Sequence, residues 1–471
     1  MLMRVLFSNM KRAGIFLSTA LLLSCSTSQP LLHEEIVQKA LPGVLIPSKF
    51  VGDDSGFVPQ TPTDWLEQLQ DPELKTLIDE ALGSSPDMRA FAARIEQSEA
   101  MVQAINSSFY PSVGATVKEG AKLGLGGSGT SGFYVGAGWE VDLWGRVRAQ
   151  NESARKSAQA IVFEQESAQL SLIANLTKTL WTARSLSMQV LIAQDIAQSS
   201  LALLRYVKHR QKIGIASRNE VQIAQANLAV AQEAVENARS SYQKTLMAID
   251  MLVGRYPVGT ALTSQALPGI PKAYAKGLPS ELLERRPDIL AAALRLDAAR
   301  LNIDEAKSAR LPKISLSAGF GLIKSSVFVL STSAANPSLG IGLDVPLFTA
   351  GALDQKVKMR EAEMDLAYAN YAKIGLTAFN EVETALLLEK NWRVRSAELE
   401  KAYAIQVLQL SSLEKEQKIG RIDGRAVEQQ KATVLGALSK LEQSKLEILV
   451  QRINVYLALG GPVQLIEKEK K

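Results

Sequence analysis

The chain carries one succession of landmarks twice. Pro86 and Pro111 recur as Pro287 and Pro312 at an offset of 201, and the Gln-Lys-Ile-Gly that ends at Gly214 recurs at an offset of 206. The offset grows while the order is kept, which is what a drifted duplication produces. We therefore predict two equivalent halves that each supply one segment of a pseudo-symmetric wall. A duplicated helical protein without a pore is the alternative.

Each half contains a region in which apolar residues occupy every second position. These are Phe133, Val135, Ala137, Trp139, Val141 and Leu143 in the first half, and alternate residues of 314–322 and 339–347 in the second. A period of two predicts strands with one apolar and one polar face. Connectors rich in Gly and Ser, at 124–132 and 325–338, complete two predicted β-hairpins.

The apolar face of these strands is expected to contact lipid, with Glu140, Asp142 and Asp344 inside the wall or near the interface. Strands of about ten residues suit a tilted crossing of a membrane. The alternative is the solvated face of a soluble β-sandwich, for which two hairpins are too few strands.

Two stretches predict unusually long helices. Residues 146–213 contain neither Gly nor Pro, and residues 352–419 are interrupted only by Gly375. A coiled-coil-like seam of small or apolar residues follows the first stretch: Ala154, Ala158, Ile161, Ala168, Leu172, Leu176, Leu180, Ala183 and Val190. Each long helix should turn at a glycine, Gly214 or Gly420, and return as a shorter helix to Gly254 or Gly460.

Four amphipathic strands cannot close a barrel, and open strand edges are not tolerated in lipid. Closed cyclic symmetry solves this problem. Two chains would give eight strands, whose interior is filled by side chains, whereas three would give twelve and leave room for solute. A homotrimer is therefore the smallest conducting assembly, and the long helices would continue the barrel as an α-helical tube.

The N-terminus has the pattern of a bacterial lipoprotein signal. Three basic residues in the first twelve positions precede an apolar run at 15–23, which ends in Leu22-Leu23-Ser24-Cys25. Cys25 is the only cysteine of the chain and is the predicted site of lipid attachment. Ser26 suits sorting to the outer membrane. An ordinary signal peptide with an incidental cysteine is the alternative. No later segment has the length of uninterrupted apolar residues that a spanning helix needs.

Charge and composition argue against other classes of function. Three of the 53 basic residues lie in the predicted signal peptide, which leaves 50 against 48 acidic residues, so nucleic-acid binding loses its main support. The two histidines are His33 and His209. With a lipidated cysteine they provide no zinc set or nucleophile–base pair. We expect no enzyme, metal or cofactor.

Several short motifs occur in a specific order along the chain. They are Asp71-Pro72-Glu73-Leu74 with Leu77, Trp139 to Arg146, Gly277-Leu278-Pro279-Ser280, Leu283-Glu284-Arg285-Arg286-Pro287-Asp288 and Asp344-Val345-Pro346-Leu347-Phe348. On these motifs the chain resembles the TolC-like outer-membrane efflux channels, specifically their lipoprotein branch. The resemblance covers nearly everything after Cys25.

This resemblance implies an α+β fold in which very long helices form a periplasmic tunnel and four strands per chain join a twelve-stranded outer-membrane barrel. It also implies a homotrimer that docks to a periplasmic adaptor and to an inner-membrane pump, commonly of the resistance-nodulation-division type. Such a channel would passively conduct small molecules or drugs. The exit duct of a type I protein-secretion system is the alternative, and a structural coiled-coil lipoprotein that spans the periplasm is another.

The two helical turns are the predicted periplasmic entrance, because they are the ends of the long helices farthest from the strands. Candidate adaptor-docking residues are Gly214, Ile215, Ala216, Gly420, Ile422 and Gly424. Ordinary helix–turn–helix corners are the alternative.

The closed aperture is expected at the second turn. In related channels this turn often reads Gly-x-Ile-Asp with a second Asp six residues later, and here Gln429 stands at that later position. The candidate aperture residues are Arg421, Asp423, Arg425 and Glu428. Threefold symmetry would gather them into rings, with the arginines pairing to acids of a neighbouring chain. Solvated turn charges are the alternative.

The expected organisation is a signal peptide (1–24), a lipidated, extended tether (25–63), a first repeat (64–260, with its hairpin at 112–144), a linker (261–280), a second repeat (281–463, with its hairpin at 313–348) and a tail (464–471).

Overall fold

The computed structural model describes residues 33–51, 71–118, 130–264, 266–270, 279–325 and 336–461. The signal peptide with Cys25, most of both hairpin connectors, much of the linker and the tail lie outside the described residues. Two compact units are formed, one by residues 1–44, 94–162 and 291–373, the other by 45–93, 163–290 and 374–471. Helices α5 (Pro86–Asn106), α6 (Arg146–Lys212), α9 (Pro287–Ser308) and α10 (Ala352–Lys418) contribute residues to both units.

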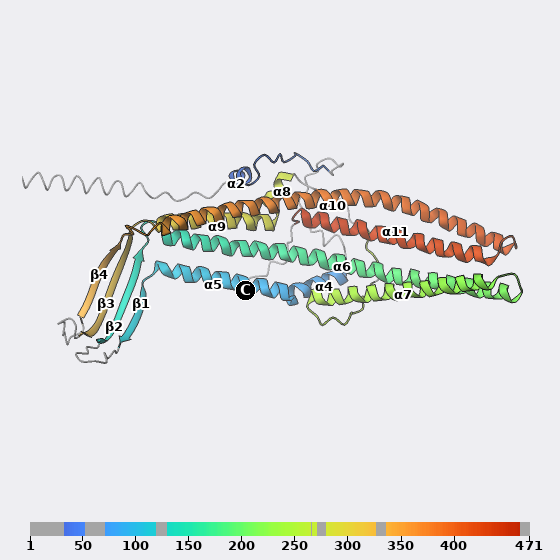
Figure 1. The fold of residues 1–471 in the computed structure, drawn as a ribbon, viewed down its shortest axis with the longest axis horizontal. Coiled ribbons are helices and arrows are strands. Elements are labelled where there is room, and N and C mark those ends of the chain that lie inside the picture. The colour runs from blue at the N-terminus through green and yellow to red at the C-terminus, as the bar shows by residue number, and fades with distance from the viewer. Residues whose placement is uncertain are drawn as a thin grey trace, which may run out of the picture. The chain divides into compact units, whose positions relative to one another are not determined.

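The first unit contains one antiparallel sheet. Its strands are β1 (Ser112–Lys118), β2 (Thr130–Val141), β3 (Lys313–Ser325) and β4 (Asn336–Asp344), in the spatial order β1-β2-β3-β4 (Figure 1). Strands β2 and β3 join the two halves of the chain, with Ala137 opposite Ala318. This register places the apolar positions of all four strands on the same face.

Two strands end earlier than the alternation predicts. The apolar pattern runs to Leu143 and Leu347, but β2 ends at Val141 and β4 at Asp344. Asp142 leaves the ladder because its carboxylate accepts hydrogen bonds from two backbone N–H groups in the first turn of α6. After β4, Pro346 has no N–H with which to continue a ladder.

The expected long helices are present in both halves. Helices α6 and α10 each span 67 residues, and α10 continues through Gly375 without interruption. They return as α7 (Arg218–Val253, 36 residues) and α11 (Gly424–Ala458, 35 residues). Among the described residues, no helix is both long and apolar enough to cross a membrane.

The duplication is also visible where the returning helices end. Gly254 and Gly460 both have positive φ, and a Cβ on either would crowd the segment before α5 or α9. At Gly254 it would lie 2.7 Å from the Ser84 carbonyl oxygen, and at Gly460 it would lie 2.9 Å from Cγ of Arg286. Glycine is therefore required at both positions by conformation and by close approach.

The main core of the second unit packs α4 (Pro72–Ser84) against α6, α7 and α11. Seam positions Leu172, Leu176, Leu180 and Ala183 are buried there, and Trp181 is fully enclosed. The Asp71 motif fixes α4 on this core. The Asp71 carboxylate caps α4 by accepting a hydrogen bond from the Leu74 N–H, and it binds the buried guanidinium of Arg184. The same guanidinium also contacts Glu73.

The predicted extended tether contains a short helix, α2 (His33–Ala40). Ile36 and Leu41 are buried, and the Lys39 ammonium lies 4.5 Å from the ring centroid of Tyr368 on α10. The prolines on which the extended reading relied lie outside this stretch, and acidic residues in the first turn with Lys39 in the last favour a helix. The extended reading is therefore wrong for residues 33–40.

Candidate functional site

The two helical turns of the second unit close by the same backbone motif. Gly214 and Gly420 have φ of +78° and +75°. After each glycine the next N–H bonds back over five residues, from Ile215 to the Arg210 carbonyl and from Arg421 to the Glu416 carbonyl, both at 2.9 Å. This is a Schellman closure, which satisfies carbonyls left open at a helix end. We call residues 213–217 the first tip and residues 419–423 the second tip.

The returning helices begin at repeat-equivalent residues with different chemistry. Ser217 caps α7 and forms a capping box with Glu220, with bonds of 3.1 and 2.8 Å. At the equivalent position, Asp423 caps α11 by accepting from the Arg425 N–H at 3.0 Å. The second tip therefore carries a charged cap where the first carries a neutral one.

Asp423 also joins the two tips through ion pairs. Its carboxylate accepts from the Arg210 guanidinium of α6 at 2.5 Å and from Nε of Arg425 at 3.0 Å. Arg425 lies 3.4 Å from a carboxylate oxygen of Glu220. We call Arg210, Glu220, Asp423 and Arg425 the tip cluster. It alternates two cations with two carboxylates and links three helices, α6, α7 and α11.

The tip cluster keeps its acids ionised. Partial burial alone would raise the pKa of Asp423, but the hydrogen bonds and charge of Arg425, with the charge of Arg210, outweigh it and lower the pKa below 3.8. Hydrogen bonds from Ser217 lower the pKa of Glu220, and the two arginines act in the same direction. Both carboxylates are therefore charged at neutral pH.

The other candidate aperture residues stand apart from this cluster. Arg421 is exposed, and Glu428 pairs with Lys431 one turn along α11 at 2.9 Å. Gln429 is also exposed. The anticipated partner of Asp423 was an arginine of a neighbouring chain, whereas the structure pairs Asp423 with two arginines of its own chain.

The candidate docking residues differ in exposure. Ile215 is 60% exposed, whereas Ile422 is half-buried and Ala216 packs against the small core of Leu204 and Val207. A Cβ on Gly424 would lie 3.1 Å from Nε2 of Gln417 and 3.4 Å from the Tyr206 ring, so the glycine leaves room for the Gln417 side chain. Two exposed apolar residues that sequence reasoning did not single out, Ile213 and Ile419, flank the same turns.

Sequence reasoning also missed Arg210 and Glu220. Glu220 had a readable signal, because Ser217 and Glu220 have the spacing of a capping box. Arg210 had none, since its partner Asp423 lies 213 positions away and the repeat places an acid, Glu416, at the equivalent position.

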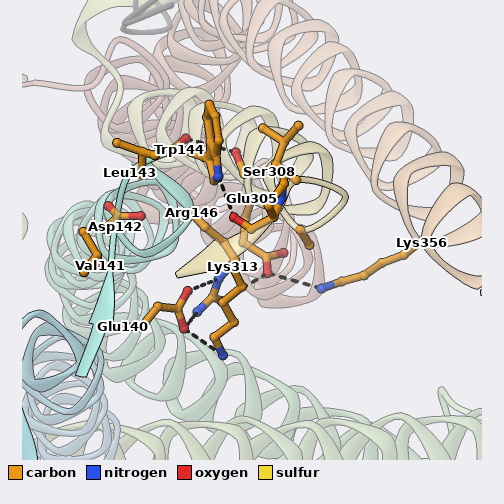
Figure 2. Close-up of a pocket in the computed structure, with 13 residues that line it drawn as sticks. Glu140, Val141, Asp142, Leu143, Trp144, Arg146, Glu305, Ser308, Lys313 and Lys356 are labelled. Carbon is orange, nitrogen blue, oxygen red and sulfur yellow. Dashed lines mark hydrogen bonds and ion pairs between the residues drawn. The ribbon is translucent and has the colours of Figure 1, made fainter. Parts of the chain in front are cut away.

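A second charged site lies in the first unit, where strands meet helices. Figure 2 shows Glu140, Arg146 and Lys313 pointing toward one another. Arg146 binds Glu140 with two hydrogen bonds of 3.0 and 2.9 Å, and Lys313 reaches the same carboxylate at 2.9 Å. Lys356 of α10 pairs with Glu305 of α9 at 3.2 Å. These charges line a cavity of about 240 Å³ and neutralise one another.

The segment from Trp139 to Arg146 is explained by these contacts. The Trp139 and Trp144 indoles donate to the Phe109 and Pro312 carbonyls at 3.0 and 2.7 Å, which ties β2 and its exit to the neighbouring segments. Gly145 has φ of +76°, so the chain turns there into α6. This motif therefore fixes the passage from strand to helix.

In the described part of the chain, no group of three or more His, Cys, Asp or Glu residues is placed to hold a metal ion.

The chain matches the family model described as outer membrane efflux protein over residues 77–255 and 278–461. It is 30% identical over 344 residues to the pyoverdine export outer membrane protein OpmQ of Pseudomonas putida, covering 68% of this chain and 72% of that protein. It is 23% identical to the cation efflux system protein CusC of Escherichia coli, covering 89% and 94%.

Solved structures agree at the level of the fold. The outer-membrane channel OprN superposes with a TM-score of 0.78 at 24% identity, covering 89% of this chain and 97% of that one. The CmeC outer membrane channel of Campylobacter jejuni superposes with a TM-score of 0.79 at 19% identity, covering 93% and 95%. With the match to the family model, these findings place the chain in the outer membrane efflux protein family, whose members are outer-membrane exit channels of efflux systems.

Proposed function

We propose that this channel passively exports small molecules, received from a periplasmic adaptor and an inner-membrane pump of the resistance-nodulation-division type. The observation that carries the substrate class is the set of related proteins, which are named for export of pyoverdine, toluene and cations. The family consists of channels rather than enzymes. The charges of the tip cluster pair within that cluster, and the charges at the strand–helix junction pair within that junction.

The sheet supports a trimeric barrel. Strands β1 and β4 are the outer strands of the four-stranded order, so each has one edge without a partner among the described strands. In a homotrimer, β4 of one chain pairs with β1 of the next, which closes twelve strands and removes every edge. The apolar face, where Leu339 is 89% and Ile341 77% exposed, then contacts lipid, and the Ser- and Gly-rich face lines the lumen.

The two tips are proposed as the adaptor-docking site. Ile213, Ile215 and Ile419 are between 56% and 69% exposed and offer apolar anchors beside charged side chains. Gly214, Ala216, Gly420, Ile422 and Gly424 shape the turns that present them. Crosslinkers placed at Ala216 or Ile422 should capture an adaptor in intact cells, and persistent failure at both positions would count against docking here.

The tip cluster is proposed as the lock of the closed aperture, with Asp423 as its centre. Asp423 binds Arg210 on α6 and Arg425 on α11, so the two tips cannot separate without breaking its ion pairs. Threefold symmetry places three such locks around the axis. Arg421 and Glu428 stand apart from the cluster and add charge to the entrance without closing it.

We further propose that Cys25 carries the lipid anchor after cleavage behind Ser24, and that the chain is organised as 1–24, 25–63, 64–260, 261–280, 281–463 and 464–471. Twelve strands bury far more apolar surface than acyl chains. Cys25→Ser should therefore weaken anchoring and leave the barrel inserted. Mass spectrometry of the mature protein tests the modification, and an unmodified Cys25 would refute it.

Deletion of the gene tests the exported class. Loss of the channel should raise the intracellular content of a panel of small toxic compounds and siderophores, and the full chain should restore export. If small-molecule export is unchanged and a secreted polypeptide disappears from the medium, the protein serves type I secretion instead.

A further inference from the structure

The polar face of the sheet carries one aromatic side chain among the described strand residues. Most positions on this face are Gly, Ser or Thr, which leave little side chain above the backbone. Glu140, Lys313 and Asp344 also lie on this face, where the strands meet the helices, and Tyr134 of β2 stands opposite Gly321 of β3. A bulky ring among glycines requires a local explanation.

The ring lies against three glycines, Gly136, Gly319 and Gly321, which we call the glycine bed. A Cβ built on Gly136 would lie 2.5 Å from Cε1 of Tyr134, and one built on Gly319 would lie 2.7 Å from Cε2 and overlap the phenol oxygen. A Cβ on Gly321 would lie 3.1 Å from Cδ2. The ring therefore occupies the space that three side chains would fill, and it lies flat on the backbone.

The three glycines differ in what an added methyl group would displace. At Gly321 it would meet backbone atoms, the Phe133 carbonyl oxygen and Cα of Tyr134, so a change there disturbs the sheet. At Gly136 and Gly319 the nearest atoms all belong to the outer part of the Tyr134 ring. Because that part can rotate about its side-chain torsions, a methyl group at either position should lift the ring and spare the backbone.

We infer that the glycine bed holds Tyr134 flat against the barrel wall and thereby sets the free width of the lumen, which makes Tyr134 a size-determining residue of the channel. This inference rests on the proposed function, in which the polar face lines the lumen. In a threefold assembly three rings lie at one level, so each lifted ring narrows the same cross-section. Large solutes should be affected more than small ions.

Single-channel recording on the purified, full-length trimer in planar lipid bilayers tests the inference. Every trimer in this comparison carries Asp423→Ala, so that the proposed tip lock does not limit the conductance, and the Asp423→Ala trimer without a barrel substitution serves as its wild type. Gly319→Ala and Gly136→Ala should each lower the conductance and lower the size of the largest polyethylene glycol that enters the pore. Gly138→Ala, on the same face of the inner strand β2 and with only Oγ of Ser112 at 4.0 Å from the added Cβ, is the matched control and should conduct like the wild type. Adding Tyr134→Ala to either variant should restore conductance, because without the ring nothing is lifted.

Three results would overturn the inference. Wild-type conductance in both alanine variants would show that the ring does not move into the lumen. A loss that persists after Tyr134→Ala would place the cause in the sheet and not in the ring, as would a fall in trimer stability without a change in pore size. If the wild-type trimer itself never conducts, the proposed function fails, which is a separate outcome from any difference among the variants.

Discussion

The two helical tips share a backbone and differ in their side chains. Both close at a glycine with φ near +76° and the same bond back over five residues. Ser217 then caps the first returning helix within its own turn, whereas Asp423 caps the second and also binds Arg210 of the other hairpin. The two tips therefore share a backbone fold. The residue at one cap position, Asp423, connects the second tip to the helix that leads into the first.

This difference separates a local role from a connecting role. An N-cap of either type contributes about 1 kcal/mol to its own helix. Only Asp423 also forms ion pairs. Its partners are Arg425, the second residue of α11, and Arg210 of α6. Substitutions at the two cap positions should therefore cost similar helix stability and differ in their effect on closure.

Asp423→Ala is expected to have the largest effect. It removes the cap and leaves Arg210 and Arg425 as like charges without their shared carboxylate. If closure loses about 1.4 kcal/mol, the open fraction rises about tenfold. Uptake of a large polar dye that an intact outer membrane excludes measures this effect in cells.

Ser217→Ala is the control for that variant, because it removes the repeat-equivalent cap without removing an ion pair of Asp423. Amide hydrogen exchange at the start of α7 should accelerate while dye uptake stays at the wild-type level. Equal uptake in the two variants would show that helix capping alone, and not the link between tips, governs closure.

Arg210→Gln should have the next largest effect. Asp423 keeps its cap and its bond to Arg425 but loses the connection to α6. Arg421→Gln removes an exposed arginine of the second tip and is the matched control. Dye uptake should rise for Arg210→Gln and remain unchanged for Arg421→Gln; the reverse order would move the lock to Arg421.

The pH dependence of closure should be smaller and confined to acid conditions. The pKa of Asp423 is lowered in the folded protein, so its contribution is fully present above the ordinary value of 3.8 and is lost as pH falls through the lower folded value. Conductance should therefore stay constant between about pH 5 and 8 and rise below about pH 4. In Asp423→Asn this acid step should disappear, and a step near pH 6 would point to another group.

Glu220→Gln should have the smallest effect. Glu220 is 40% exposed, lies 3.4 Å from Arg425, and retains its capping geometry as a glutamine. Exposed pairs of this kind contribute little to stability and are screened by salt. A slight rise in conductance at low ionic strength that vanishes at high salt is expected. A rise as large as that of Asp423→Ala would make Glu220, and not Asp423, the centre of the cluster.

The sequence predicts what depends on spacing along the chain. The absence of Gly and Pro over 146–213 predicts the single helix α6, and the glycine positions predict where it turns. Alternation predicts β2, β3 and β4, and the Gly- and Ser-rich connector at 124–132 implies β1 as the partner of β2. These features follow from backbone conformation and periodicity, which neighbouring residues determine.

Contacts between distant segments could not be predicted in this way. The pairing of Arg210 with Asp423 and the packing of Tyr134 on Gly319 each join residues far apart in the chain. Neither has a spacing that distinguishes it from a solvated charge or an ordinary strand residue. Helix α2 was also missed, because its burial of Ile36 depends on other parts of the first unit and not on its own short pattern.

Reconstitution of the purified full-length protein tests the central claim that this chain is an outer-membrane exit channel locked at its second tip. Wild-type trimers in planar lipid bilayers should give small, discrete conductance steps, and Asp423→Ala trimers should give larger steps of the same kind. Trimers that insert but conduct in neither form would contradict the channel, and equal conductance in both forms would contradict the lock.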